Sequence, residues 1–311
     1  MQNNLAFVFP GQGSQSLAML ADFADHEVVQ STFSEASEAL GYNLWQLVQD
    51  GPVEKLNQTN FTQPALLTAS VAIWRLWHAS SSASPKVLAG HSLGEYSALV
   101  CAGVLSLADA VKLVEKRGEF MQASVPEGVG AMAAVIGLDD DIIISACEQA
   151  ADNDVVSAVN FNSPGQVVIA GHKDAVARAG VLCKEAGAKR VLPLPVSVPS
   201  HCALMKDAAD KLAEEFNNVT FNVPNIPVIN NVDVKAESSV DAIKAALIKQ
   251  LYSPVRWTET IQYLAQQGID TAIEAGPGKV LQGLLKRIDK TISCQSVNDK
   301  ISLTKALESV E

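Results

Sequence analysis

The chain has 311 residues, of which 48% are hydrophobic and 18% charged, and its formal net charge is -11 at pH 7. This length suits one large or two unequal domains, and the apolar content excludes a disordered chain. The acidic charge argues against broad binding to the phosphate backbone of nucleic acid. Any acidic ligand or partner must therefore meet a local cluster of positive charge.

Cysteine usage and the longest apolar stretch indicate the compartment. The five cysteines contain no C-x-x-C pair, which predicts neither a disulfide framework nor a zinc site and suits a reducing compartment. The N-terminal residues carry no basic side chain and lead directly into the apolar run 5–9, which favours a first strand over a signal peptide. The apolar stretch 64–77 is interrupted by Arg75 and is shorter than a membrane span requires. We therefore expect a cytoplasmic protein with no membrane partner and no metal.

The first part of the chain alternates short apolar runs with longer amphipathic ones, a pattern typical of α/β proteins. The runs 5–9 and 86–89 predict strands that are buried on both faces. The polar, proline-ended stretch 80–85 predicts a connection. Helices are predicted at 27–39, 65–77, 93–102 and 106–121.

The middle of the chain has a different order of elements, predicted as βαββαβ. This order is that of the split βαβ, or ferredoxin-like, unit. A turn-rich segment, 160–165, separates its second and third strands, and Pro193, Pro195 and Pro199 mark its end. The six elements are the strands 131–136, 155–159, 166–170 and 190–194 and the helices 139–151 and 173–186.

The C-terminal part resumes the alternation of strands and helices. Together these patterns predict a large α/β domain with a parallel sheet and a small, inserted ferredoxin-like domain. We expect the large domain to comprise 1–126 and 198–311, and the small domain 127–197. The predicted C-terminal elements are the strands 226–230 and 271–274 and the helices 240–251, 258–267 and 280–287.

The run Gly90-His91-Ser92-Leu93-Gly94 matches the G-x-S-x-G pattern of a nucleophile elbow. The glycines let the backbone turn sharply from strand into helix, so that the serine stands at the tip of the turn. The context fits, because a predicted strand precedes the run and a predicted helix follows it. The backbone N–H of Leu93 would face a developing oxyanion at the start of this helix. The pattern predicts Ser92 as a catalytic nucleophile, with a plain N-cap serine as the competing interpretation.

Two glycine-containing segments are incomplete versions of phosphate-binding motifs. Gly11-Gln12-Gly13 follows a predicted strand, yet the third glycine of G-x-G-x-x-G would be Ser16. Gly278-Lys279 lacks both the upstream glycine and the following serine or threonine of a P-loop. Neither segment predicts a nucleotide site.

A set of motifs follows in order along the chain: GQGSQ at 11–15, GHSLGEY at 90–96, Arg117, GAM at 130–132, NFNSPGQ at 160–166, PSH at 199–201 and EAGPG at 274–278. In this combination the chain resembles the malonyl-CoA:acyl-carrier-protein transacylase family, which charges the carrier protein in type II fatty acid synthesis. The resemblance covers nearly the whole chain. It implies a hydrolase-like α/β domain with a ferredoxin-like insert. It also implies a ping-pong reaction in which the serine takes malonyl from coenzyme A and passes it to the carrier's phosphopantetheine thiol, without a metal or a cofactor of its own.

His201 is the general base that the resemblance implies. It lies in a proline-marked loop before a predicted helix, and from spacing alone a structural role explains it equally well. The resemblance further implies that the backbone carbonyl of Gln250 orients the imidazole in place of an aspartate. His91, beside the serine in the turn, is expected to be structural.

Arg117 follows Val114 by three residues on the predicted helix 106–121, so it lies on or beside the buried stripe of that helix. Its planar guanidinium would fit the free carboxylate of a malonyl group as a bidentate clamp. An arginine at the edge of the stripe that extends to solvent is the competing interpretation.

The resemblance implies further contributors to substrate binding. Gln12 and Leu93 belong to the acyl pocket and oxyanion region, and Asn160 and Asn162 face the cleft from the small domain. Gln12 sits in a glycine-flanked loop from which its side chain could reach Ser92. For the two asparagines, ordinary turn chemistry explains the residue type nearly as well.

Malonyl-CoA and an acidic acyl carrier protein are the partners that the resemblance implies, with the enzyme itself a monomer. Because this chain is acidic too, docking needs local positive patches, and Lys189-Arg190, Lys279 and Lys286-Arg287 are the candidates. Three other functions stay open on the sequence: a serine hydrolase that passes the acyl group to water, an acyltransferase of a polyketide pathway, and a non-catalytic interaction domain.

Overall fold

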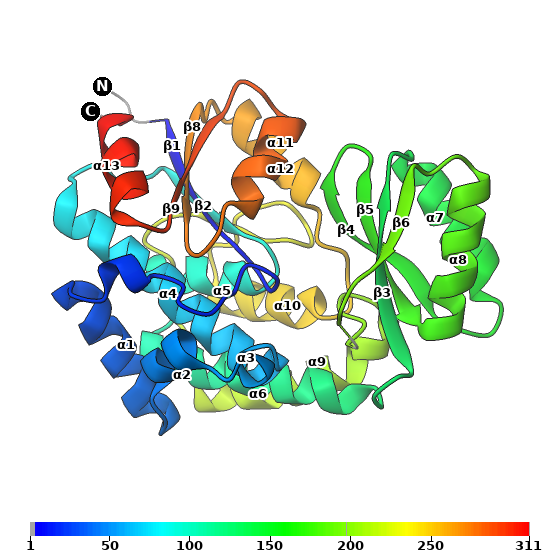
Figure 1. Ribbon diagram of the computed structural model, residues 1–311, viewed down its shortest axis with the longest axis horizontal. Coiled ribbons are helices and arrows are strands. Elements are labelled where there is room, and N and C mark those ends of the chain that lie inside the picture. The colour runs from blue at the N-terminus through cyan, green and yellow to red at the C-terminus, as the bar shows by residue number, and fades with distance from the viewer. Residues whose placement is uncertain (1–3, 197, 311) are drawn as a thin grey trace.

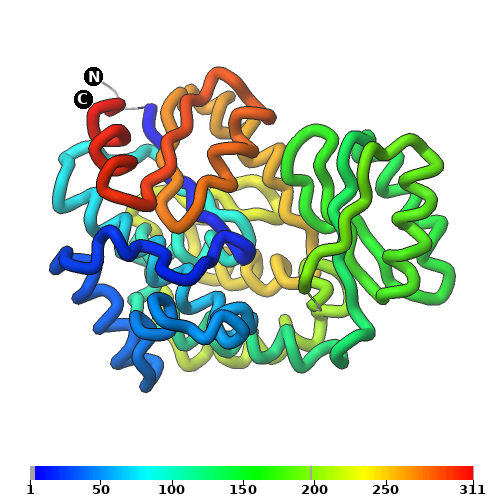
Figure 2. The backbone as a smooth tube through the Cα atoms, in the orientation of Figure 1, coloured from blue at the N-terminus to red at the C-terminus, as the bar shows by residue number. Residues whose placement is uncertain are grey.

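Two sheets organise the chain, one of five strands and one of four. The computed structural model describes residues 4–196 and 198–310. In Figure 1 the four-stranded sheet and its helices form the green part at the right, and the other elements form the larger part at the left. The tube in Figure 2 shows the chain leaving the larger part, building the smaller one and returning. The predicted boundary residue 197 lies outside the described residues, and the predicted domain limits stay a prediction.

The five-stranded sheet is parallel throughout, in the order β7-β2-β1-β8-β9. Phe7 and Phe9 of the central strand pack on one side of the sheet, and Ala6 and Val8 pack on the other. Successive side chains of a strand point to opposite faces, so this continuous apolar run requires cover on both sides. The predicted α/β class with a parallel sheet is confirmed. The strands are β1 (Leu5–Phe9), β2 (Val87–Gly90), β7 (Val228–Ile229), β8 (Thr271–Ala275) and β9 (Ser293–Val297).

Helices cover both faces of this sheet (Figure 1). Trp77 of α4 packs on the face that carries Phe7, whereas Trp257 of α11 and Leu281 of α12 pack on the opposite face. Among the residues that the structure describes, no helix is both long and apolar enough to cross a membrane. The helices are α1 (Glu27–Leu40), α2 (Leu44–Asp50), α3 (Val53–Leu56), α4 (Thr59–Ser80), α5 (Leu93–Cys101), α6 (Leu107–Ser124), α9 (Lys206–Glu215), α10 (Val240–Gln250), α11 (Trp257–Gln266), α12 (Val280–Ile288) and α13 (Lys300–Glu308), with short 3-10 turns at Ala21–Phe23, Ala203–Met205 and Phe216–Asn218.

The four-stranded sheet is antiparallel and has the order β4-β5-β3-β6. With the chain order β3-α7-β4-β5-α8-β6, this is the ferredoxin-like arrangement predicted from the sequence. One face packs against α7 and α8. The other face packs against Cys202, the residue after His201. The elements are β3 (Gly130–Ile136), α7 (Asp140–Ala151), β4 (Val156–Ser163), β5 (Gln166–His172), α8 (Lys173–Glu185) and β6 (Arg190–Pro193).

Two predicted boundaries are wrong in ways that matter for the site. Strand β4 continues through Asn160 and Asn162, which were expected in a turn. It continues because its end is bridged to the larger part, where the Phe161 N–H donates to the Val255 carbonyl at 3.0 Å. Helix α4 starts six residues before the predicted position and contains Pro64. Its burial along almost its whole length outweighs the hydrogen bond that the proline removes.

Candidate active site

A sharp turn between β2 and α5 carries Ser92. The serine has φ 53° and ψ -107°, a conformation that few non-glycine residues adopt. A Cβ atom at Gly90 would overlap the backbone of Gly94, and one at Gly94 would overlap the carbonyl of Phe9. Both glycines are therefore required by close backbone packing, as the elbow pattern predicts.

The loop before α9 brings His201 to this serine. Its Nε2 lies 2.8 Å from Ser92 Oγ, and its Nδ1 lies 2.7 Å from the carbonyl oxygen of Gln250. A carbonyl only accepts, so Nδ1 carries the proton and Nε2 is free to accept one from the serine hydroxyl. Burial, with the positive charge of Arg117 as a second cause, lowers the pKa of His201 to about 3. The imidazole is therefore neutral near pH 7, the form that a general base needs.

Arg117 lies inside the site and is 1% exposed, which excludes the solvent-edge interpretation. Its guanidinium donates to Gln63 Oε1 at 2.8 Å and to Gln250 Oε1 at 3.1 Å, and it lies 3.4 Å from Ser92 Oγ. Within the described part of the chain, no carboxylate forms a salt bridge with it, and its Nε has no hydrogen-bond partner. A buried cation beside a nucleophile, with no carboxylate in contact with it, is a site for an anionic substrate group.

The two backbone N–H groups at the elbow differ, because one has a hydrogen-bond acceptor and the other is left for a ligand. The N–H of Ser92 donates to Asn231 Oδ1 at 2.7 Å. Leu93 is the first residue of α5, so its N–H has no acceptor within the helix and points out of the helix start. The Leu93 N–H is thus the backbone donor that remains for an oxyanion.

The other predicted binding residues lie at the rim of the site. Gln12 is exposed, and its side chain donates to Thr59 Oγ1 at 3.3 Å, so the expectation that it reaches Ser92 is not met in this structure. The bond to Thr59 holds the side chain along the wall of a pocket that also includes Gln122 and Val196.

The two asparagines approach the elbow from β4. Asn162 Oδ1 lies 2.8 Å from His91 Nε2, and this hydrogen bond joins the four-stranded sheet to the elbow. His91 also packs edge-on against Trp257, which supports the structural role expected for it. The Oδ1 atom of Asn160 is buried and has no hydrogen-bond partner among the described residues, so it is an acceptor left for a ligand.

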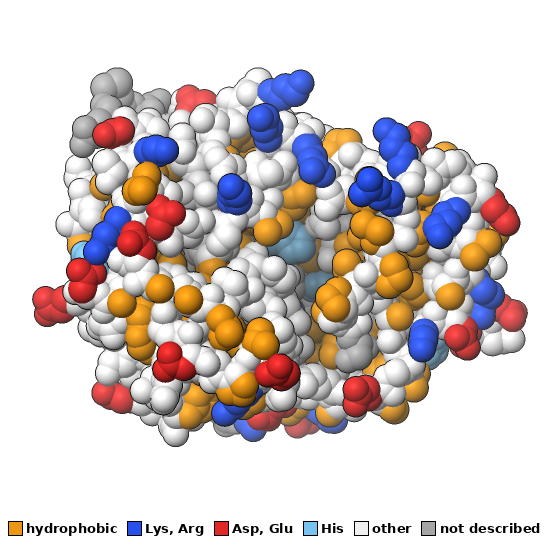
Figure 3. Space-filling view, viewed as in Figure 1, with side chains coloured by type: hydrophobic (Ala, Val, Ile, Leu, Met, Phe, Trp, Pro, Cys, Tyr) orange, Lys and Arg blue, Asp and Glu red, His pale blue; other side chains and the backbone are white. Residues whose placement is uncertain are grey.

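The surface is hollowed between the two parts, with histidine side chains at the floor of the hollow (Figure 3). Lysine and arginine side chains gather along its upper rim and on the smaller part. We call Lys286 and Arg287 the α12 pair, and Lys189 and Arg190 the β6 pair; all four are exposed. Arg287 also donates to Gln166 Oε1 at 2.7 Å, linking α12 to β5.

Sequence reasoning missed three residues that hold the site together: Gln63, Glu95 and Asn231. Gln63 is a large polar residue directly before the apolar run 64–67 of α4, which is the signal that could have identified it. Glu95 is part of the GHSLGEY motif, but its place in the first turn of a helix does not by itself indicate a role. Asn231 lies in a loop and has no local signal.

A serine on an elbow, a neutral histidine at hydrogen-bond distance and a free oxyanion donor define a serine site for acyl chemistry. The sequence model of the acyl transferase domain matches residues 6–302. The malonyl CoA-acyl carrier protein transacylase of Escherichia coli K12 is 64% identical over 304 residues, covering 97% of this chain and 98% of that protein. The Haemophilus influenzae protein of the same name is 64% identical over 96% of each chain. The chain belongs to the acyl transferase family, among the malonyl CoA-acyl carrier protein transacylases.

Solved structures agree over the whole chain. A crystal structure of an acyl carrier protein S-malonyltransferase from Vibrio cholerae is 66% identical, covers 97% of this chain and 99% of that one, and has a TM-score of 0.96. A malonyl-transacylase in complex with its type II polyketide synthase carrier protein is 61% identical. It covers 98% of this chain and 99% of its own, with a TM-score of 0.97. The two-part fold is therefore that of these enzymes.

Proposed function

We propose that this enzyme transfers the malonyl group from malonyl-CoA to the phosphopantetheine thiol of acyl carrier protein through a Ser92 ester, and supplies malonyl groups for fatty acid biosynthesis. The observation that carries the proposal is the buried Arg117 guanidinium, 3.4 Å from Ser92 Oγ and without a carboxylate partner in the described residues. The free carboxylate of malonyl supplies a partner in direct contact. The names of the close relatives support the same reaction.

In the first half-reaction, Ser92 Oγ attacks the thioester carbonyl while His201 Nε2 accepts its proton. The Leu93 N–H stabilises the oxyanion of the tetrahedral intermediate. The intermediate collapses by breaking the C–S bond, and the departing coenzyme A sulfur takes the proton from the imidazolium. The phosphopantetheine thiol then repeats these steps in reverse, so that the malonyl thioester leaves and Ser92 regains its proton.

In this mechanism, malonyl binding also raises the basicity of His201. The charge of Arg117 is one of the causes that lower the pKa of His201. A malonyl carboxylate held on the guanidinium cancels this charge, so the imidazole gains basicity when the correct substrate is bound. An acetyl group has no carboxylate and gives neither the contact nor the gain in basicity.

The predicted division of the chain assigns one wall of the proposed substrate cleft to each domain. Under this proposal, 1–126 and 198–311 supply the catalytic wall, and the small domain, 127–197, supplies Asn160 and Asn162 for the pantetheine or acyl group. The enzyme works in the cytoplasm as a monomer and needs no metal or cofactor beyond the phosphopantetheine that the carrier brings.

Carrier protein is expected to dock on the α12 and β6 pairs. Reversing either pair to glutamate should raise the KM for carrier protein by about tenfold and leave the KM for malonyl-CoA unchanged, because surface charges steer an acidic partner to the cleft. Steady-state kinetics with each substrate varied in turn measures both constants. The control is the double reversal of Lys116 and Lys211, exposed lysines of α6 and α9. KM values for carrier protein that stay unchanged in both reversals would exclude these two pairs as the docking site.

The fate of the acyl group tests the proposed reaction against a hydrolase. With malonyl-CoA alone, each enzyme molecule should release one molecule of coenzyme A, and the release should then stop. Added holo carrier protein should then yield malonyl-carrier protein in step with further coenzyme A release. Steady formation of free malonate without carrier would identify a hydrolase instead.

Service in a polyketide pathway is the second candidate, because a close structural relative is bound to a polyketide carrier protein. The ratio of kcat/KM values for a fatty acid carrier and a polyketide carrier decides between the two pathways.

A further inference from the structure

A buried carboxylate lies directly behind the elbow. Glu95, on α5 three residues after the serine, is 3% exposed. Among the acidic, basic and histidine side chains of the described residues, four are buried to this degree: Glu95, Arg117, His201 and Glu274. Glu274 accepts from backbone N–H groups at the start of α12. Glu95 is therefore the buried carboxylate whose hydrogen bonds lead toward the catalytic residues.

One oxygen of Glu95 holds two residues that in turn hold the elbow. Its Oε2 accepts from the Asn231 N–H at 3.0 Å and from Gln250 Nε2 at 2.8 Å. Asn231 accepts from the Ser92 N–H at 2.7 Å and donates to the Gly90 carbonyl at 2.6 Å. Asn231 therefore clamps both ends of the turn, and Glu95 fixes Asn231.

The second residue, Gln250, connects Glu95 to the rest of the site. Its Nε2 also donates to the Ser92 carbonyl at 3.0 Å, and its Oε1 accepts from Arg117 at 3.1 Å. Its backbone carbonyl accepts from His201 Nδ1. The amide thus turns its nitrogen to the carboxylate and its oxygen to the guanidinium, the orientation that minimises the energy of both charges.

We propose that Glu95 is a positioning residue that acts through Gln250 and Asn231: it fixes the elbow and supplies the buried negative charge that an aspartate supplies in a Ser-His-Asp triad. The inference rests on the proposed function of Ser92 and His201. When His201 takes the serine proton, the imidazolium develops close to the positive charge of Arg117. Gln250 lies between Glu95 and these two residues, because it hydrogen-bonds to all three. The negative charge of Glu95 offsets the unfavourable interaction between the imidazolium and the guanidinium.

The surroundings of Glu95 make its charge dependent on pH. Burial raises the pKa of Glu95 to about 7, against the opposing effects of Gln250, Asn231 and Arg117. The other ionisable groups that face it are Tyr96, Asp233 and Glu237. Because the ionised form is the active one in this proposal, activity should rise with pH through about 7.

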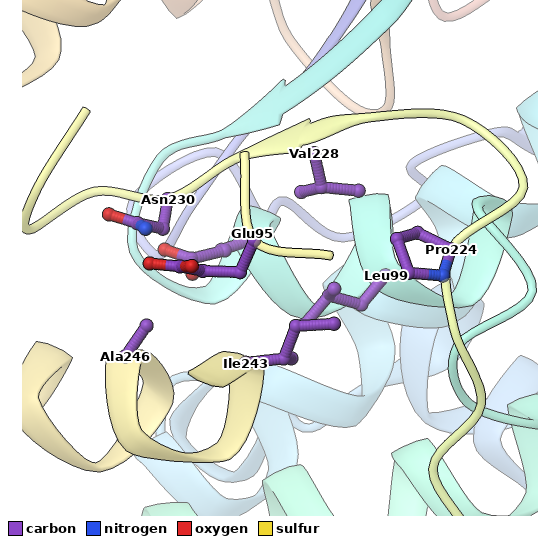
Figure 4. Close-up of a pocket in the computed structure, with 8 residues that line it drawn as sticks. Glu95, Leu99, Pro224, Val228, Asn230, Ile243 and Ala246 are labelled. Atoms are coloured by element: carbon purple, nitrogen blue, oxygen red, sulfur yellow. The ribbon is translucent and has the colours of Figure 1, made fainter. Parts of the chain in front are cut away.

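The carboxyl also borders a small cavity, shown in Figure 4. Glu95 and Asn230 lie at one end, and Leu99, Val228 and Ile243 line the other. The Asn230 Nδ2 group has no hydrogen-bond partner among the described residues. A side-chain amide in place of the carboxyl would border this small cavity, which Asn230 and Glu237 also line.

Glu95→Gln tests the proposal, because it removes the charge and keeps an oxygen that can accept from Asn231 and Gln250. We expect the rate of Ser92 acylation at pH 8 to fall about tenfold or more, the change that one pKa unit of lost imidazolium stabilisation produces. The KM for malonyl-CoA should stay the same or fall, and the loss of activity below pH 7 should disappear. Thermal stability at pH 8 should be equal or higher, because the variant no longer buries a charge.

A purely structural role predicts the opposite pattern for Glu95→Gln. In that case stability and activity fall together, and the pH profile keeps its shape; this result would overturn the proposal, as would a wild-type acylation rate. Glu274→Gln is the matched control, a buried carboxylate outside the site, which should lose stability without a change in the pH profile. Ser92→Ala is run in parallel: loss of the malonyl adduct in that variant, together with wild-type behaviour of Glu95→Gln, would refute this inference alone.

Discussion

His201→Ala is expected to slow acylation by malonyl-CoA by about 10³-fold, the usual effect of removing the base from a serine-histidine pair. The Nε2 atom at 2.8 Å from Ser92 Oγ is the acceptor nearest to the hydroxyl proton, and no other described side chain donates to or accepts from that oxygen except the Arg117 guanidinium. An arginine cannot accept a proton. The rate is measured as coenzyme A release in a single turnover.

His78→Ala is the matched control for this measurement. His78 is an exposed histidine of α4, and its ring bonds only the carbonyl of Trp74 among the described residues. This control should acylate at the wild-type rate. A His201→Ala enzyme that acylates as fast as the control would exclude His201 as the base.

The second large effect is expected from Arg117→Ala, which should change the acyl group that the enzyme prefers. The kcat/KM for malonyl-CoA should fall by about 10²-fold or more, the cost of removing a buried charged partner. The kcat/KM for acetyl-CoA should stay the same or rise, because the pKa of His201 is no longer lowered by the arginine. Competition between the two thioesters, read as malonyl- and acetyl-enzyme, measures the ratio.

Arg117→Lys separates charge from geometry. Lysine keeps the positive charge but cannot form the planar, two-pronged contact, so it should recover only part of the malonyl preference. A thermal melt accompanies both variants, since each leaves the Gln63 and Gln250 oxygens without their guanidinium partner. An Arg117→Ala enzyme that keeps the wild-type ratio would contradict the carboxylate clamp.

The elements around the nucleophile were predictable because their signals are local. The apolar run of β1 predicts a buried strand, and the glycines of the elbow predict a tight turn. Each of these patterns lies within a few consecutive residues. The edge strand β9 was missed because its side chains are mostly exposed or half-buried, so it lacks a run of apolar residues. Helix α13 was missed although Asp299 and Ser302 form a capping box at its start.

The site itself was only partly predictable. Ser92 and His201 are 109 residues apart, and they were predicted as a pair from the resemblance to the transacylase family and not from their spacing. The hydrogen bonds behind them join Glu95 to Asn231 and Gln250, which are 136 and 155 residues away along the chain. The sequence alone contains no measure of such distances in space. For the same reason the sequence does not reveal that residues of β7 and α10 lie against Glu95.

The intact mass of the enzyme after mixing with malonyl-CoA shows whether Ser92 carries the acyl group. We expect a single malonyl adduct on the wild-type protein, no adduct on Ser92→Ala, and loss of the adduct when holo carrier protein is added. Ser97→Ala, which changes a buried serine of α5, should still carry the adduct. A malonyl adduct that persists on Ser92→Ala would exclude Ser92 as the nucleophile, because another residue would then carry the acyl group.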